Sequence, residues 1–315
     1  MTERVVYSYV SLDRDAVSDL SKFAKVYTQE SLEAEEVKPK AEVIICISIK
    51  PEEFQKLRSL KFIQVLSAGV DGLPWPHVPP HVMVAGNMGS NADAVAEHTW
   101  AILLSIAKKT CHYFQKVQGG DFKRDVQLHL LSGKTLAVIG MGSIGAKVAE
   151  VGKVFSMRVI GVTKSGKART NVDEIFDAGK LGEVLPQADV LVISTPLTKH
   201  TKGMFRFENL RLLKKGCIVV NVGRAEVVDR DGLLRFLRER PDVVFATDVW
   251  WEVKPEGSWE TELNKLPNFF GTPWIAGAFG TPEVYNRMVK AAINNVIKYL
   301  NGQKPDNIID RTEYV

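Results

Sequence analysis

The chain contains 315 residues, of which 45% are apolar and 25% charged, and its net charge is +4. This length suits one large domain or two ordinary ones, and the composition is typical of a globular protein with a sizeable core. The mild positive charge, without a long run of Lys or Arg, does not favour nucleic acid as a partner.

The cysteines and the first residues indicate the compartment. An odd, sparse set of three cysteines (Cys46, Cys111 and Cys217) argues against a disulfide framework, and no Cys-x-x-Cys or His-rich cluster predicts a metal site. The start MTERVVYSYV lacks the features of a signal peptide, and no stretch approaches the ~18 apolar residues of a membrane helix. We therefore expect a cytoplasmic protein with neither a metal nor a membrane partner.

The first part of the chain alternates short apolar runs with helical patterns. The runs at 5–10, 42–49, 62–68 and 82–86 are predicted strands, and the Pro-rich stretch 74–81 is a predicted loop. This alternation predicts a parallel sheet with covering helices.

Residues 92–118 form one long helical pattern whose apolar positions are too many for a single narrow stripe. We expect this helix to be buried on more than one side, between two domains or two subunits. It favours a homodimer.

The alternation of strands and helices restarts after Gly133 and predicts a second doubly wound unit. The chain ends in an amphipathic helical pattern at 282–303. Within the second unit, helices are predicted at 143–155, near 173–178, at 207–213 and at 230–239.

A Gly-x-Gly-x-x-Gly motif lies between a predicted strand and a predicted helix. Gly140 allows a tight turn, Gly142 lets the backbone approach a pyrophosphate, and Gly145 lets helix and strand pack closely. Free N–H groups at the helix start would bind the anion. The context favours a dinucleotide site over a purely structural turn, and the cofactor contacts would include Met141, Ser143 and Ile144.

The next predicted strand, MRVIGV, is not followed by the carboxylate that binds the ribose hydroxyls in NAD sites. Thr163, Lys164 and Ser165 stand there, and Lys167 and Arg169 follow. Hydroxyl and cationic groups would attract a 2′-phosphate, so we expect NADP rather than NAD. The alternative is a solvated basic loop.

Together these segments resemble the D-isomer-specific 2-hydroxyacid dehydrogenase family over nearly the whole chain. The resemblance implies two doubly wound α/β domains: a Rossmann nucleotide domain, 98–280, inserted into a flavodoxin-like substrate domain of residues 1–97 and 281–315. The segments that carry it are SAGVDGL (67–73), AEHTWAILLSIAK (96–108), GKTLAVIGMGSIG, LPQADVLVISTPLTKHTKGMF (185–205), NVGRAEVVDRDGL (221–233) and ATDVWW (246–251).

The resemblance also implies roles for individual residues. Arg224 matches the family's arginine, which holds the substrate carboxylate and the reacting oxygen. The backbone N–H groups of Ala68, Gly69 and Val70 would bind the carboxylate. The residues expected beside the cofactor on its nicotinamide side are Thr195, Pro196, Val222, Gly223 and Asp248.

The family's acid–base pair is altered in this sequence. Trp274 stands where the family has a catalytic His, and indole N–H is a donor that does not titrate near neutral pH. The family's Glu would fall at Val253, with Lys254 before Pro255, so only Glu252, one residue early, remains to serve. His98, in the long helical pattern, is expected to be packed or hydrogen-bonded there.

The resemblance implies an oxidoreductase that transfers a hydride between NADP(H) and a small 2-oxo or 2-hydroxy acid, such as glyoxylate or hydroxypyruvate. Loss of general acid–base assistance costs a factor of about 10² to 10⁴, so turnover is expected to be slow. The alternative is a nucleotide-binding redox sensor or binding protein with little or no turnover.

Overall fold

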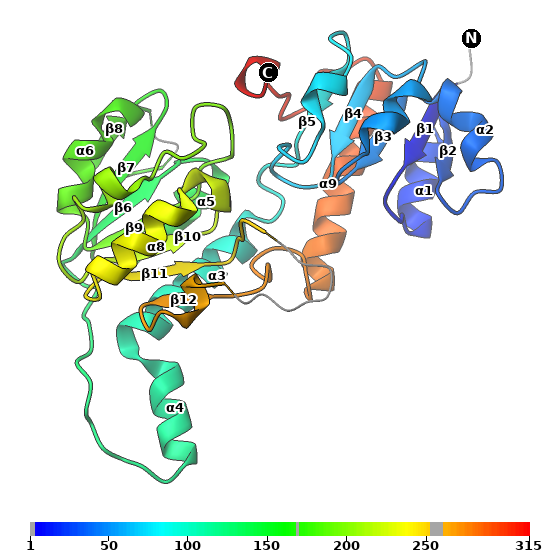
Figure 1. Cartoon of the computed structure of the whole chain (residues 1–315). Helices are drawn as coiled ribbons and strands as arrows, with labels where there is room; N and C mark the ends of the chain where they lie inside the picture. Colours follow the sequence, from blue (N-terminus) through cyan, green and yellow to red (C-terminus); the bar gives the residue numbers. More distant parts are fainter. Residues whose placement is uncertain (1–3, 168–169, 253–260) are drawn as a thin grey trace. The chain divides into compact units, whose positions relative to one another are not determined.

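The computed structural model describes residues 4–167, 170–252 and 261–315, and it divides into two compact units (Figure 1). The smaller unit comprises residues 1–91 and 278–315, and the larger one residues 92–277. The resemblance places the crossings near residues 97 and 281. In the structure, the whole helix that starts at Ala92 belongs to the larger unit, because Val95, Ala96 and Trp100 are part of that unit's core.

The smaller unit is built on a five-stranded parallel sheet in the order β2-β1-β3-β4-β5, counted over the described residues. This is the flavodoxin-like order. The strands β1, β3 and β4 are buried along their whole length because helices cover the sheet, whereas the edge strand β2 is not buried. The strands are β1 (Val5–Ser8), β2 (Lys25–Thr28), β3 (Val43–Cys46), β4 (Phe62–Val65) and β5 (Met83–Ala85), and the helices are α1 (Arg14–Ser21), α2 (Ala34–Val37) and α9 (Pro282–Leu300).

The larger unit is built on a seven-stranded parallel sheet in the order β12-β11-β10-β9-β6-β7-β8, again over the described residues. Chain order reverses between β6 and β9, as in a Rossmann fold, and ligands bind at the carboxyl edge of such a reversal. The strands are β6 (Thr135–Ile139), β7 (Arg158–Thr163), β8 (Glu174–Asp177), β9 (Val190–Ile193), β10 (Ile218–Asn221), β11 (Val244–Thr247) and β12 (Phe269–Gly271). The helices are α3 (Ala92–Lys108), α4 (Thr110–Gln118), α5 (Ser143–Val154), α6 (Leu181–Val184), α7 (Phe207–Leu210) and α8 (Arg230–Glu239).

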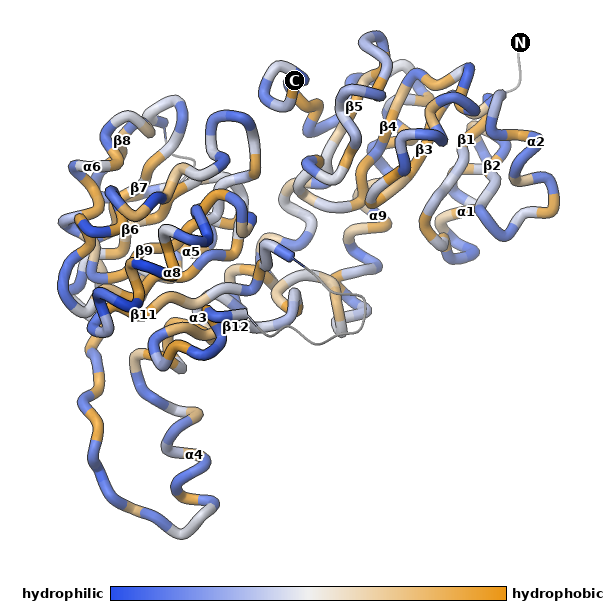
Figure 2. Tube along the Cα trace, in the orientation of Figure 1, coloured by the Kyte–Doolittle hydropathy of each residue, from blue (hydrophilic) through white to orange (hydrophobic). Residues whose placement is uncertain are grey.

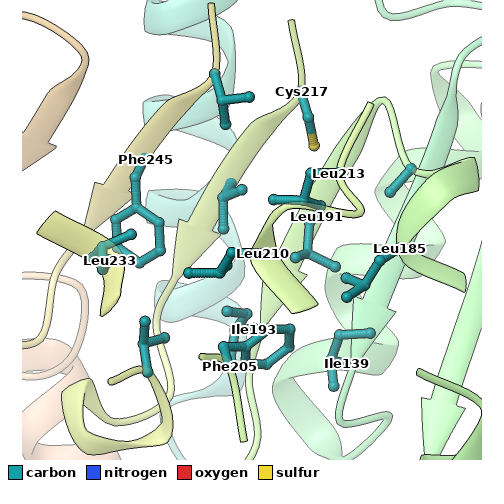
Figure 3. Close-up of a cluster of buried hydrophobic side chains, with 14 of the residues drawn as sticks. Ile139, Leu185, Leu191, Ile193, Phe205, Leu210, Leu213, Cys217, Leu233 and Phe245 are labelled. Carbon is teal, nitrogen blue, oxygen red and sulfur yellow. The ribbon is translucent and has the colours of Figure 1, made fainter. Parts of the chain in front are cut away.

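Helices on both faces of the larger sheet enclose two apolar cores. One core lies against α3 and α5, and the other, drawn in Figure 3, lies against α7 and α8 and includes the fully buried Phe205, Phe236 and Phe245. The hydropathy colouring shows the apolar segments concentrated along the strands (Figure 2). The apolar side chains thus lie in the two cores on the faces of the sheet, and the carboxyl ends of the strands remain available to bind a ligand.

Two secondary-structure predictions are wrong. The single long helix predicted over 92–118 is broken at Lys109, whose left-handed backbone (φ 52°) ends α3 and starts α4. Residues 174–177 form strand β8, not a helix, because they pair in parallel with β7 at the edge of the sheet.

Helix α3 is covered within its own unit, whereas α4 has no buried residue. Figure 1 shows α4 and the extended segment after it reaching away from the sheet of the larger unit. No helix among the described residues is both long and apolar enough to cross a membrane. The described part of the chain also holds no group of three or more His, Cys, Asp or Glu side chains placed to bind a metal ion.

Candidate active site

The Gly-rich loop connects β6 to α5 at the point where the strand order reverses. Gly140 has φ 97°, and a Cβ there would lie 2.8 Å from the backbone nitrogen of Thr195. A Cβ on Gly145 would lie 2.0 Å from the carbonyl oxygen of Gly140. These two glycines are therefore required by the turn and by the packing of helix on strand.

Gly142 is different, because a Cβ there would meet no atom within 4 Å. Gly142 is the N-cap of α5, and no side chain caps that helix end. The open face of Gly142 and the uncapped N–H groups of the first turn fit a pyrophosphate that approaches the backbone closely.

Two loops at the carboxyl ends of β9 and β10 pack against each other beside this turn. Thr195 is buried, and its Oγ1 has no hydrogen-bond partner among the described residues. A Cβ on Gly223 would lie 2.5 Å from the carbonyl oxygen of Thr195. Because a buried hydroxyl without a partner costs free energy, Thr195 Oγ1 fits a group of a bound ligand. The residues present thus fit a dinucleotide.

The predicted ribose end of the site lies at the end of β7. Thr163 Oγ1 accepts a hydrogen bond from the backbone N–H of Lys167 at 3.1 Å, which closes a short turn over Lys164 and Ser165. Asp177, the last residue of β8, pairs in register with Thr163. Asp177 is exposed and accepts a hydrogen bond from the backbone N–H of Gly179 at 2.9 Å. Sequence reasoning missed this carboxylate because it took residues 173–178 for a helix; Arg169 lies outside the described residues.

Arg224 follows β10 and is held by a buried amide. Asn221 Nδ2 donates to the carbonyl oxygen of Arg224 at 2.9 Å, and Asn221 Oδ1 accepts from the N–H of Gly223 at 3.0 Å. Arg224 Nη1 donates to the carbonyl oxygen of Gly223 at 2.9 Å. The turn is therefore rigid, and Arg224 is half-buried at the sheet edge where ligands bind. Asn221 is a supporting residue that the sequence motif contained but did not single out.

Asp248 follows β11 and is hydrogen-bonded to the segment that follows β12. Its carboxylate accepts hydrogen bonds from Thr272 Oγ1 at 2.6 Å and from the N–H groups of Ile275 at 3.0 Å and Ala276 at 2.9 Å. His98 on α3 completes the network, with Nε2 2.9 Å from Thr272 Oγ1 and 3.6 Å from Asp248 Oδ1. The prediction that His98 is hydrogen-bonded is confirmed. The contact of Asp248 with a cofactor stays a prediction.

Trp274 lies inside the segment that is hydrogen-bonded to Asp248, between Thr272 and Ile275. Its backbone is left-handed (φ 57°), a conformation that is unfavourable for a bulky side chain and that persists only where neighbouring contacts hold it. Its backbone N–H donates to the carbonyl oxygen of Thr272 at 3.1 Å, and the residue is 44% exposed. The segment thus presents an indole at the carboxyl edge, where it can donate a hydrogen bond but not exchange a proton.

Because β10, β11 and β12 are neighbours, Arg224, Asp248 and Trp274 all lie at one edge of the larger sheet. Glu252, five residues after β11, is exposed. Val253, Lys254 and Pro255 lie outside the described residues. The structure does not bring Glu252 into the network around Asp248.

The predicted carboxylate loop belongs to the smaller unit and follows β4. Ser67 Oγ donates to the carbonyl oxygen of Gly69 at 2.7 Å, and Trp75 Nε1 donates to that of Val70 at 3.1 Å, so the carbonyl groups of the loop are engaged. Among the described residues, no acceptor faces the N–H groups of Ala68, Gly69 or Val70. Three adjacent unpaired donors are suited to an anion.

Comparison with known proteins gives concordant results. Residues 100–276 match the family model described as "D-isomer specific 2-hydroxyacid dehydrogenase, NAD binding domain". A glyoxylate reductase of Aeropyrum pernix is 33% identical over 238 residues, which is 73% of this chain and 70% of that protein.

Two solved structures are similar over almost their full length. A Pyrobaculum aerophilum crystal structure described as a "putative formate dehydrogenase" is 40% identical, with a TM-score of 0.85 and coverage of 98% of this chain and 99% of that one. A D-isomer specific 2-hydroxyacid dehydrogenase family protein of Aeromonas salmonicida is 26% identical, with a TM-score of 0.82 and coverage of 98% and 100%.

Proposed function

The chain belongs to the D-isomer specific 2-hydroxyacid dehydrogenase family, and on that premise we propose that it is an NADP-preferring reductase of small 2-oxo acids. Glyoxylate and hydroxypyruvate are the first candidates, and the glyoxylate reductase of A. pernix supports the former. The observation that carries the proposal is the arrangement of the Gly-rich loop, Thr195 and Arg224 at one carboxyl edge of the larger sheet.

Each part of this edge has a role in the proposal. A bound nicotinamide dinucleotide supplies the hydride donor or acceptor. The N-terminus of α5 holds the pyrophosphate, and Thr195 Oγ1 binds the cofactor on its nicotinamide side. Arg224 binds the substrate carboxylate and stabilises the negative charge that develops on the reacting oxygen. In the smaller unit, the N–H groups of residues 68–70 bind a carboxylate.

Proton supply is the step for which the described residues at this edge include no evident group. Reduction of a ketone leaves an alkoxide that must take up a proton, and Trp274 cannot give one. Its replacement of a titratable group also favours the second candidate function, a nucleotide-binding redox sensor with little turnover. We propose the reductase first, because Arg224 and the donors of the 68–70 loop have no use in a sensor of the dinucleotide alone.

The two candidate functions are separated by a steady-state assay with NADPH or NADH and a panel of 2-oxo acids. The proposal expects slow but measurable turnover of at least one acid. Tight dinucleotide binding without turnover of any acid, and without binding of any acid, would favour the sensor.

The cofactor preference is tested by calorimetry. Thr163, Lys164, Ser165 and Lys167 support tighter binding of NADPH than of NADH, whereas the carboxylate of Asp177 works against a 2′-phosphate. Thr163→Asp should shift the preference toward NADH. In a separate variant, Asp177→Asn should make the preference for NADPH stronger than in the unchanged protein. Equal or tighter binding of NADH by the unchanged protein would end this part of the proposal.

We propose a homodimer, but on fewer residues than the whole helical pattern 92–118 from which the sequence predicts it. The apolar residues of α3 are covered by the larger unit itself. The proposal therefore rests on the exposed apolar side chains of α4 and the segment after it: Phe114, Val117, Phe122, Leu128 and Leu130. A monomeric mass by light scattering at micromolar concentration would refute it.

A further inference from the structure

The segment that contains Trp274 adjoins a buried negative charge. Asp248 is 4% exposed, and its carboxylate accepts hydrogen bonds from neutral donors, which are the Thr272 hydroxyl and two backbone N–H groups. Among the described residues, neither Lys nor Arg pairs with this carboxylate, and His98 Nε2 lies 3.6 Å from Asp248 Oδ1. In this part of the chain, the negative charge beside Trp274 therefore has no permanent counter-cation.

The indole of Trp274 also attracts positive charge. The face of a Trp ring carries partial negative charge and attracts a cation that lies within about 6 Å of the ring centroid. Trp274 is 44% exposed, so a ligand at the carboxyl edge of the sheet can contact it. A carboxylate and an indole together disfavour the negative charge that develops on a keto oxygen during reduction. They favour a reacting group that carries a positive charge.

Arg224 supplies the opposite charge at the same edge. It follows β10, whereas Trp274 follows β12, and β11 lies between these two strands. Because neighbouring strands are about 4.8 Å apart, the ends of β10 and β12 are separated by roughly 10 Å. An arginine side chain, a small acid and an indole together can fill this distance. The edge thus suits a zwitterion whose carboxylate binds Arg224 and whose cation contacts Trp274.

We propose that this site reduces iminium ions formed from a 2-oxo acid and ammonia or a primary amine, and that Trp274 favours these ions over the free acid. The inference rests on the proposed hydride chemistry and on the proposed role of Arg224. It extends the substrate class from 2-oxo acids to their iminium forms, and the product is an amino acid or an N-alkyl amino acid.

An iminium ion removes the need for a proton donor in the hydride step. In solution, the amine nitrogen bonds to the keto carbon, one proton is taken up, and the keto oxygen leaves as water, which gives a C=N⁺ bond. A hydride from the bound dinucleotide then bonds to that carbon, and the π electrons of the C=N⁺ bond move to the nitrogen. The iminium ion is reduced to an amine by the two electrons of the hydride, and the dinucleotide is oxidised. Reduction of a ketone, by contrast, leaves an alkoxide that needs a proton.

A comparison of two amines in the unchanged protein tests the activity. Oxidation of NADPH or NADH is followed with each acid of the 2-oxo acid panel, in methylamine or in trimethylamine at equal pH and ionic strength. Methylamine condenses with a 2-oxo acid to an iminium ion, whereas trimethylamine has no N–H bond and cannot. For at least one acid we expect the rate to be at least about tenfold higher in methylamine, with the N-methyl amino acid identified by mass spectrometry.

A binding measurement tests the role of Trp274 without turnover. Trimethylglycine and 3,3-dimethylbutanoate have the same shape and the same carboxylate, but only trimethylglycine carries a positive charge. Calorimetry with the dinucleotide present should give trimethylglycine an affinity about 3- to 30-fold higher. Trp274→Leu should remove this preference, and Trp274→Phe, which keeps an aromatic face, should retain part of it. Both variants place a β-carbon at the same left-handed position, so they are matched in backbone strain.

The outcomes separate the inference from the proposed reductase. Equal rates in the two amines, with measurable reduction of a 2-oxo acid, would overturn the inference and leave the reductase intact. A preference for trimethylglycine that is absent, or that Trp274→Leu leaves within twofold, would also overturn it. Turnover that requires methylamine would support the inference and contradict the reduction of free 2-oxo acids. Absence of turnover in every mixture would contradict both.

Discussion

The loop after β6 and the segment after β12 lie at the same edge of the larger sheet. Each contains a residue with positive φ, but the two residues differ in how readily they adopt that conformation. In the first, the left-handed position is Gly140, which adopts it without strain. In the second it is Trp274, which is held there by the hydrogen bonds that Asp248 and Thr272 make around it. The dinucleotide loop therefore relies on local backbone chemistry, whereas the segment with Trp274 depends on tertiary contacts.

This difference bears on the proposed function, in which the dinucleotide loop is intact and the acid–base pair is altered. The glycines of the first loop leave room for a ligand at Gly142 and close packing elsewhere. The second segment keeps a fixed backbone and presents a side chain that does not titrate. Under the proposed function, binding and proton transfer are therefore separable, and a single substitution should remove either one on its own.

The largest expected effect is on substrate binding. Arg224→Ala removes the planar cation beside the reacting group and should lower kcat/KM for a 2-oxo acid by about 10² to 10³ or more. Dinucleotide affinity by calorimetry should stay within about twofold. Arg235→Ala, on the exposed face of α8, is the matched control and should change neither quantity. Unaltered kcat/KM in Arg224→Ala would remove this residue from the site.

The glycines of the dinucleotide loop should respond unequally. Gly145→Ala forces a Cβ to 2.0 Å from a carbonyl oxygen, so we expect a loss of about 1–3 kcal/mol or more in the free energy of unfolding. Gly142→Ala meets open space and should cost under about 1 kcal/mol. It should nevertheless weaken dinucleotide binding about tenfold, because the methyl group occupies the space of the pyrophosphate. Equal stability losses in the two variants would refute this assignment.

The smallest effect concerns the backbone of Trp274. Trp274→Gly and Trp274→Ala both remove the indole, but only glycine adopts φ 57° without penalty. The Gly variant should therefore be more stable than the Ala variant by about 1 kcal/mol in denaturant unfolding. If the Ala variant is the more stable one, the segment does not hold residue 274 in the left-handed region.

The features that the sequence predicts well are those set by local motifs. The Gly-rich loop has its glycines where turn and helix packing need them, and Arg224 lies at the end of its strand. The sequence does not predict the break at Lys109, because lysine is an ordinary helix former and its left-handed backbone is not encoded locally. Strand β8 is short and only half-buried, so it lacks the apolar run that marks most of the other strands.

The network around Asp248 could not be predicted for a different reason. His98, Asp248 and Thr272 are far apart in the chain and meet only because α3 and the ends of β11 and β12 pack together. Asp177 likewise reaches Thr163 only through the pairing of β7 with β8. Residue patterns along one segment carry no information on such contacts.

The central claim is that the site binds a 2-oxo acid but lacks a proton donor at residue 274. Turnover of the unchanged protein and of Trp274→His, measured over a pH series with saturating dinucleotide, tests it most directly. We expect the variant to turn over at least tenfold faster, with a new pH dependence near the ordinary His pKa of about 6.5, provided that a carboxylate such as Glu252 orients the imidazole. A typical rate of about 10 s⁻¹ in the unchanged protein, with a bell-shaped pH profile, would show that another group supplies the proton and would contradict the claim.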